Sequence, residues 1–247
     1  MAIPMAQMVL PAADDDNGGQ FTTHHVVDTH VRRKALSVVY TNNPMLVESS
    51  IQTMEQFLAE DKYQVVGFDL EYTIGRAGHN QKVVVTQLCV LHDVLVYHYH
   101  LDTRPCERFS RFINTSDYKF DAVDTTNDLK ALKVSGLKCL NLVNIQDHYK
   151  VWGSAKNKLN SLVDLASAII DPYYMKMKDE SKKDKDTWHS VWHERLDEEH
   201  VKYAANDAYT SYEMYRRVVD MRKCLVHAPT EGSSHRAVAG ASQEVDD

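Results

Sequence analysis

YQVVGFDLEYT, residues 63–73, is the segment from which the architecture can be inferred most directly. Its β-branched and aromatic residues predict a strand, in which successive side chains point to opposite faces. Asp69 and Glu71 therefore share one face, while Leu70 and Tyr72 share the other, where we expect core packing. Two carboxylates on one face of a buried strand repel each other unless a cation lies between them. A solvated sheet face is the alternative interpretation, because Asp-x-Glu is a common pattern.

Further elements are predicted on both sides of this strand. Two strands that follow it after short turns indicate an antiparallel meander. Helical spacing of apolar residues and capping signals predict the helices. The predicted strands are 24–31, 35–41, 82–92, 93–100 and 120–125, and the predicted helices are 49–60, 104–114, 128–136, 158–170 and 196–224. Residues 142–149 fit neither the two-residue repeat of a strand nor the 3.6-residue repeat of a helix clearly.

The order of these elements predicts one α/β domain. A meander followed by alternating helices and strands is the order of a ribonuclease H-like (DnaQ-like exonuclease) fold, with a central mixed sheet of five to six strands flanked by helices. We expect this domain to span residues 23–225. Residues 1–22 and 226–247 contain small, polar and acidic side chains, which predicts disordered tails.

The net charge of −7 lies mainly in the two predicted tails. Each tail carries −3, which leaves −1 for the domain between them. A nearly neutral domain can still bind a polyanion when its site holds divalent cations, because the ions count in the local charge. The acidic balance therefore does not exclude a nucleic-acid partner.

Composition narrows the class of protein and its compartment. Apolar residues make up 43% of the chain, enough to bury a core, and no apolar run is long enough for a membrane helix. The four cysteines lack zinc-site or redox-motif spacing. Reduced thiols predict a cytoplasmic or nuclear protein.

Two further segments carry candidate site residues. Tyr203 and Asp207 are four residues apart in a predicted helix, so they lie on one helical face. A Tyr–Asp hydrogen bond on an amphipathic helix is the alternative. Asp128 stands where a strand should hand over to a helix, and it could be a helix N-cap instead. Asp121 and Asp124 compete with it for the same role.

Together these segments supply four carboxylates on three elements: Asp69, Glu71, Asp128 and Asp207. That number is what a pair of divalent ions needs to hold the attacking and leaving oxygens of a phosphodiester. Oxygen ligands favour Mg²⁺ or Mn²⁺ over zinc. The sequence therefore predicts two such ions as cofactors.

The three segments resemble the motifs of the DEDD superfamily of 3′→5′ exonucleases, in the subgroup with a tyrosine in the third motif. VVGFDLEYT is similar to the first motif, TTNDLKAL to the second and YAANDAYTSYEMY to the third. The resemblance spans about residues 24–225. It looks closest to the Werner-syndrome-type exonuclease domain, with ribonuclease D more distant, and the sequence is similar in style to plant members. In the family's second motif a Gly usually precedes the Asp, whereas residues 124–127 here read DTTN.

The resemblance implies roles for the five residues. Asp69, Glu71 and Asp207 would bind one ion, Asp69 and Asp128 the other, and Tyr203 would orient or deprotonate the attacking water. The implied reaction removes nucleoside 5′-monophosphates from the 3′ end of single-stranded or overhanging nucleic acid. A catalytically weak binding or scaffold protein with this fold is the alternative, which the complete residue set disfavours. Self-association and DNA versus RNA stay undecided.

Contacts to nucleic acid are predicted at three places. Thr73 shares the face of the carboxylates and could touch a phosphate. A Lys-rich run could follow the backbone, although a solvated loop is an equal alternative. Two tryptophans near it could stack on bases. The candidates in these last two groups are Lys182, Lys183, Lys185, Trp188 and Trp192.

Overall fold

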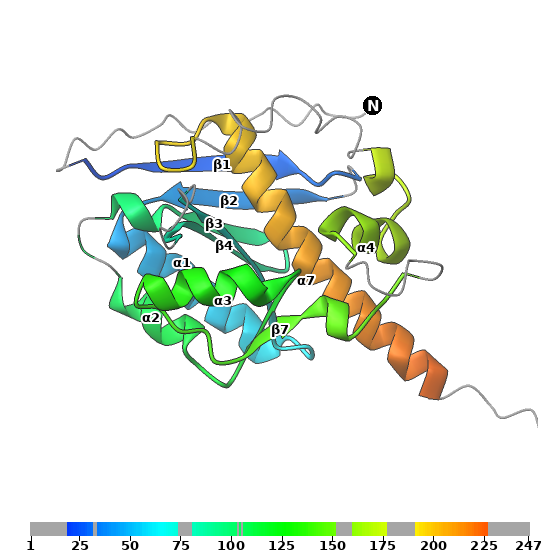
Figure 1. The fold of residues 1–247 in the computed structure, drawn as a ribbon. Helices are drawn as coiled ribbons and strands as arrows, with labels where there is room; N and C mark the ends of the chain where they lie inside the picture. The colour runs from blue at the N-terminus through cyan, green and yellow to red at the C-terminus, as the bar shows by residue number, and fades with distance from the viewer. Residues whose placement is uncertain are drawn as a thin grey trace, which may run out of the picture.

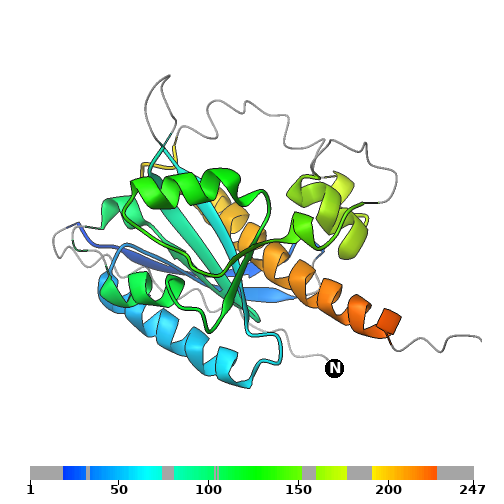
Figure 2. The ribbon, with the colours of Figure 1, turned by 60° about the horizontal axis from the view of Figure 1, so that its bottom comes forward.

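A computed structural model of the protein describes residues 19–31, 34–73, 81–102, 104, 106–151, 160–176 and 191–226. The two predicted tails lie almost entirely outside these residues. Within them, a mixed sheet is covered by helices on both faces (Figures 1 and 2). The predicted α/β class and ribonuclease H-like arrangement are confirmed.

The elements follow the predicted order. The strands are β1 (Thr22–Asp28), β2 (Ala35–Thr41), β3 (Val65–Tyr72), β4 (Val83–Val90), β5 (Asp93–Tyr97), β6 (Lys119–Ala122) and β7 (Leu142–Asn144). The α-helices are α1 (Pro44–Glu60), α2 (Glu107–Ile113), α3 (Thr125–Val134), α4 (Leu162–Ile169) and α7 (Glu198–Val226). Short 3₁₀ turns cover Tyr99–Leu101 and Ile145–Asp147.

In the described part of the chain the sheet has seven strands, in the order β1-β2-β5-β4-β3-β6-β7. β3, β4 and β5 form the predicted antiparallel meander, and β1 pairs antiparallel with β2. β2 pairs parallel with β5, β3 with β6, and β6 with β7. The prediction of five to six strands was one short. β7 comes from the segment whose period was unclear, because three residues are too few to show a repeat.

The helices form two layers, each with its own core. α1, α2 and α3 pack on one face around β3 residues such as Phe68 and Leu70. α4 and α7 pack on the other face, where β3 contributes Val65. Along β3 the side chains therefore alternate between the two layers, as the sequence predicted.

α1 begins earlier than predicted. The sequence placed its start at Ser49, but the helix starts at Pro44. The Asn43 side chain accepts a hydrogen bond of 2.9 Å from the Met45 N–H, and proline in the first turn lacks the N–H that would otherwise be unpaired there. Within the described ranges, none of the helices is both long and apolar enough to cross a membrane.

Candidate active site

β3 places Asp69 and Glu71 on the face covered by α7. Both side chains are half-buried, whereas Phe68 and Leu70 point into the opposite core. Asp69 stands opposite Gln87 on β4, and the pairing shifts between Glu71 and Tyr72. The alternation predicted from the sequence is therefore confirmed, and the two carboxylates lie near the carboxyl end of the strand.

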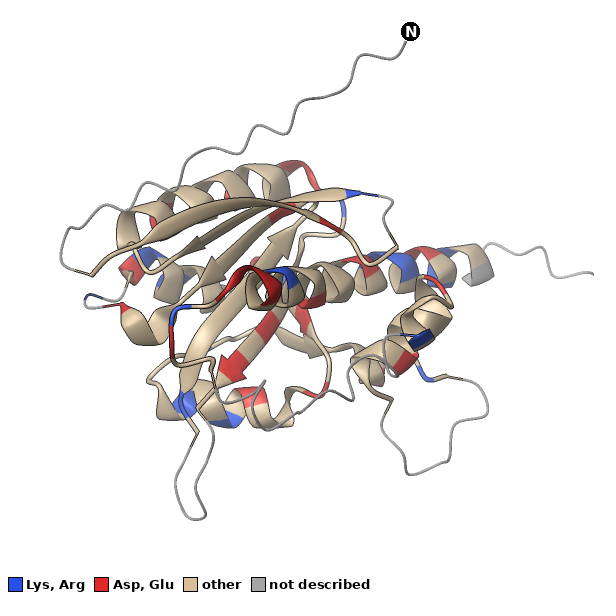
Figure 3. Ribbon diagram, turned by 90° about the horizontal axis from the view of Figure 1, so that it is seen from above, with Lys and Arg blue, Asp and Glu red and all other residues tan. Residues whose placement is uncertain are grey.

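A glycine brings α7 close to β3 at this point. A Cβ on Gly67 would lie 2.0 Å from the Ala208 carbonyl oxygen and 2.7 Å from the Tyr212 backbone nitrogen. Ala204 and Ala205, one and two residues after Tyr203, are completely buried. Small residues on both elements thus let the helix backbone approach the strand. Figure 3 shows acidic positions both at the end of a strand and on the long helix that crosses the sheet.

α7 carries Tyr203 and Asp207 to the same place. The Tyr203 hydroxyl hydrogen-bonds the Asp207 carboxylate, and Asp207 is 8% exposed. Repulsion by Asp207, followed by burial and by Glu71 and Asp69, raises the pKa of Tyr203 above its usual value. The tyrosine is therefore neutral in the protein without bound ions.

α3 brings Asp128, and it distinguishes this residue from its two competitors. Asp128 lies in the first turn, is 3% exposed, and accepts a 3.0 Å hydrogen bond from the Tyr72 hydroxyl. Asp124 is the exposed N-cap residue in a left-handed conformation, and Asp121 is buried in β6. Among these three aspartates, only the charge of Asp128 is felt by Asp69 and Glu71.

Burial destabilises the charged forms of all four carboxylates, and repulsion adds to this at Asp69 and Glu71. Burial, followed by Asp207, Glu71 and Asp128, raises the pKa of Asp69 well above its usual value. Burial and then Asp207 and Asp128 do the same for the pKa of Glu71. Burial raises the pKa of Asp207 to about 7 and that of Asp128 to about 6, although each accepts a tyrosine hydrogen bond that lowers it. Without a bound cation, the four side chains therefore favour their protonated, neutral forms more than ordinary carboxyl groups do.

This donor set fits hard divalent ions such as Mg²⁺ and Mn²⁺, which prefer carboxylate oxygens. The described side chains nevertheless contain no group of three or more His, Cys, Asp or Glu already arranged to hold a metal. Like charges without a counter-ion keep apart, so the carboxylates have to close in around an ion as it binds.

Trp192 is a correction to the predicted nucleic-acid contacts. Its ring is 2% exposed, so it cannot stack on a base. It packs instead against Tyr203, with ring centroids 6.2 Å apart, and edge-on against His200 at 5.2 Å. The tryptophan thus supports the tyrosine from behind, a contact that sequence spacing does not reveal.

The other predicted contacts are less constrained. Thr73 is half-buried, and its hydroxyl accepts a 3.1 Å hydrogen bond from the Lys82 N–H across the β3–β4 pair. Lys182, Lys183, Lys185 and Trp188 lie outside the described residues. These positions remain predictions.

Tyr72 is the residue that sequence reasoning missed. Its ring packs against the core beside Leu70, as predicted, but its hydroxyl reaches Asp128. The two residues are 56 positions apart, so no local pattern pairs them. An aromatic residue with a polar end, placed at the last position of a strand, was the available signal.

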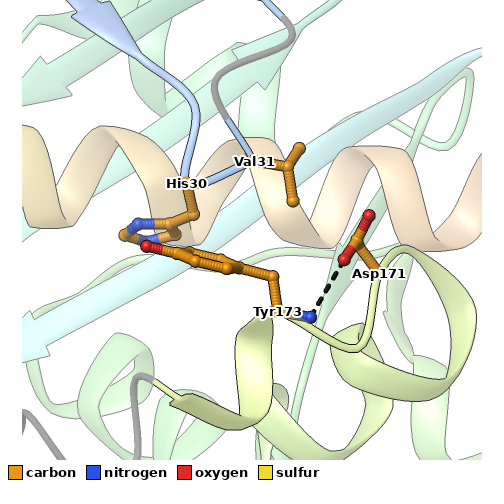
Figure 4. A pocket seen from close by; sticks show the side chains of 4 residues that line it. All are labelled: His30, Val31, Asp171 and Tyr173. Carbon is orange, nitrogen blue, oxygen red and sulfur yellow. Dashed lines mark hydrogen bonds between the residues drawn. The ribbon is translucent and has the colours of Figure 1, made fainter.

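A cavity lies between the end of β1 and the residues that follow α4. It has a volume of about 330 Å³, and the described residues that line it are His30, Val31, Asp171 and Tyr173 (Figure 4). None of the four clustered carboxylates is among them. The charge and burial of the four carboxylates, and not this cavity, therefore mark the candidate site.

Comparison with known proteins agrees with this geometry. The profile of a family described as 3′-5′ exonuclease matches residues 46–221. The Aedes aegypti Nibbler EXO domain is similar in fold at 17% identity and a TM-score of 0.51, covering 72% of this chain and 86% of that one. A search of curated protein sequences found no match.

Two ribonuclease D structures share the fold. The Trypanosoma brucei enzyme in complex with RNA U12 has 15% identity and a TM-score of 0.54, and the match covers 79% of this chain and 62% of that chain. The Escherichia coli enzyme has 14% identity and a TM-score of 0.53, with 72% and 44% covered. The matched region is thus less than two thirds of either ribonuclease D chain.

Proposed function

Because the chain belongs to the 3′-5′ exonuclease domain family, we propose that Asp69, Glu71, Asp128, Tyr203 and Asp207 form a two-metal-ion exonuclease site. The observation that carries this proposal is the gathering of four buried or half-buried carboxylates from β3, α3 and α7, in which Asp207 and Asp128 raise the pKa of both Asp69 and Glu71. Burying several carboxylates together costs much free energy unless a cation neutralises them. A pair of divalent cations is also what many enzymes use to hydrolyse phosphodiesters.

The carboxylates divide into two groups by position. The charges of Asp207, Glu71 and Asp128 all raise the pKa of Asp69, which supports Asp69 as the ligand that both ions would share. Glu71 and Asp207 would complete one ion's shell and Asp128 the other's. The ions, Mg²⁺ or Mn²⁺, would lower the pKa of the attacking water and stabilise the leaving 3′ oxygen.

Tyr203 acts on the water by orientation in this proposal. Its hydroxyl is hydrogen-bonded to Asp207, and its ring is packed against Trp192. A neutral phenol held from two sides can fix the direction of a neighbouring water by a hydrogen bond. The packing of the ring keeps that hydroxyl in place without help from solvent.

The substrate is a nucleic acid with a free 3′ end, either single-stranded or overhanging, and the products are nucleoside 5′-monophosphates. RNA is the first polymer to test, because Trypanosoma brucei ribonuclease D was solved with RNA U12. The motif sequences support the tyrosine-containing subgroup of the family and, within it, a Werner-type and plant affiliation. The four unpaired cysteines support a reducing compartment, cytoplasmic or nuclear.

A scaffold protein that has lost turnover is the alternative function. Such a protein usually lacks one of the ligands, whereas this chain keeps all four carboxylates and the tyrosine. The complete set favours the enzyme.

A labelled-substrate assay tests the proposal. Purified protein is incubated with 5′-labelled single-stranded RNA and DNA in Mg²⁺, Mn²⁺ or EDTA. We expect a ladder that shortens from the 3′ end with either metal, is absent in EDTA and is lost in Asp69→Ala. Asp117→Asn is the matched control, because Asp117 is exposed and its charge does not shift the pKa of any of the four carboxylates. No shortening of either polymer with any metal would refute the enzyme and favour the scaffold.

A further inference from the structure

Tyr72 connects two elements of the proposed site. It is the last residue of β3, and its hydroxyl donates a 3.0 Å hydrogen bond to Oδ1 of Asp128 in the first turn of α3. The ring is partly buried against the core beneath α3. A ring fixed in this way presents its hydroxyl in one direction.

Asp128 depends on that hydroxyl for its orientation. Within the described parts of the chain, Tyr72 is the sole hydrogen-bond partner of the Asp128 carboxylate. The start of α3 offers no other constraint of this kind, because its N-cap residue, Asp124, makes no side-chain capping hydrogen bond. One oxygen of the carboxylate is thus held and the other is left for a ligand.

Repulsion acts on Asp128 in the opposite sense. Asp128 lies close enough to Asp69 and Glu71 to act on them electrostatically, and carboxylates of like charge repel one another when ionised. A carboxylate without a hydrogen-bond partner would rotate away from them. The Tyr72 hydroxyl opposes this rotation and leaves the other oxygen of Asp128 available to an ion.

We propose that Tyr72 is a positioning residue that holds Asp128 ready for the divalent ion shared with Asp69, and so sets the affinity of that ion. This inference rests on the proposed two-metal function. Hydrogen-bond partners behind metal ligands fix their orientation, and losing one typically weakens metal binding about 10- to 100-fold.

Direct metal binding tests the inference without relying on activity. Mn²⁺ bound to the full chain is counted by electron paramagnetic resonance, and its affinities are measured by calorimetry, with no nucleic acid present. We expect two ions in the unchanged protein. In Tyr72→Phe, which keeps the ring, one ion should bind about 10- to 100-fold more weakly and the other unchanged.

Tyr118→Phe is the matched control. Tyr118 is also partly buried against the same core, and its hydroxyl has no hydrogen bond within the described residues. It should bind both ions as the unchanged protein does. A second control places Tyr72→Phe in an Asp128→Ala background, where the hydroxyl has no carboxylate to hold. If Tyr72 acts through Asp128, the added substitution should change Mn²⁺ affinity no further.

The outcomes separate this inference from the proposed function. Wild-type or tighter Mn²⁺ binding by Tyr72→Phe would overturn the positioning role, as would a further loss in the Asp128→Ala background. In those cases the unchanged protein would still bind two ions, and the metal site would stand. Failure of the unchanged protein to bind Mn²⁺ would instead overturn the two-metal site and, with it, the role of Tyr72.

Discussion

Substituting Gly67 by alanine tests whether the approach of α7 to β3 creates the site. The new Cβ would lie 2.0 Å from the Ala208 carbonyl oxygen and 2.7 Å from the Tyr212 backbone nitrogen. Ordinary contact begins at 3.4 Å, so the helix must withdraw by the difference, about 1.4 Å. The obstacles are two backbone atoms and the Tyr212 Cβ, none of which can rotate aside as the end of a flexible side chain can.

The withdrawal should affect stability and activity together. Overpacking of a core typically costs about 1–3 kcal/mol, and backbone obstacles favour the upper end of that range. Asp207 is adjacent to Ala208 in α7, so it moves with the helix, away from Asp69. A misplacement of about 1 Å at a reacting centre costs about 100-fold in rate. We therefore expect Gly67→Ala to lose about 3 kcal/mol of unfolding free energy and at least about 100-fold of kcat/KM.

Urea unfolding and the labelled-RNA assay, at a temperature where both proteins are folded, measure the two effects. Gly136→Ala is the control, because its φ of +71° is strained for alanine but nothing lies within 4 Å of its Cβ. It should lose about 1–2 kcal/mol and keep its activity. Wild-type stability in Gly67→Ala would refute the close approach, and lost stability with full activity would refute its link to Asp207.

Two further predictions concern the buried carboxylates. Asp121 is completely buried, its oxygens have no hydrogen-bond partner within the described residues, and burial raises its pKa. The stability contributed by its neutral form is lost as pH rises. Urea unfolding should therefore show Asp121→Asn to be more stable than the unchanged protein at pH 8 but not near pH 4. A stability difference that does not change with pH would contradict this prediction. The pKa values of Asp128, about 6, and Asp207, about 7, are also raised, so metal-free protein should lose stability as pH rises from about 4 to 7 by up to about 1.4 kcal/mol per pH unit and group. Mn²⁺ should reverse that loss in thermal unfolding scans, and an equal slope with and without the ion would count against a metal site at these residues.

Local periodicity made the two best-placed pairs predictable. Strand alternation put Asp69 and Glu71 on one face, and the helical repeat put Tyr203 and Asp207 on one face, because each pair lies within a single element. The order of strands and helices likewise predicted the ribonuclease H-like fold. β7 and the start of α1 were the exceptions, since a three-residue strand and an Asn-Pro cap carry little periodic signal.

Tertiary structure decided which side chains of different elements lie together. The sequence could not choose among Asp121, Asp124 and Asp128, because the choice depends on which of them the β6–α3 junction turns toward β3. It predicted an exposed role for Trp192, whose burial behind Tyr203 depends on how the chain before α7 packs.

Residues 63–73 contain both information that the sequence determines by itself and information that depends on tertiary structure. Its alternating pattern alone determined the face of Asp69 and Glu71. Its glycine and its last tyrosine became meaningful only with their partners, Ala208 on α7 and Asp128 on α3. The physical reason is that a repeat of two or 3.6 residues fixes directions within one element, whereas contacts between distant elements depend on packing.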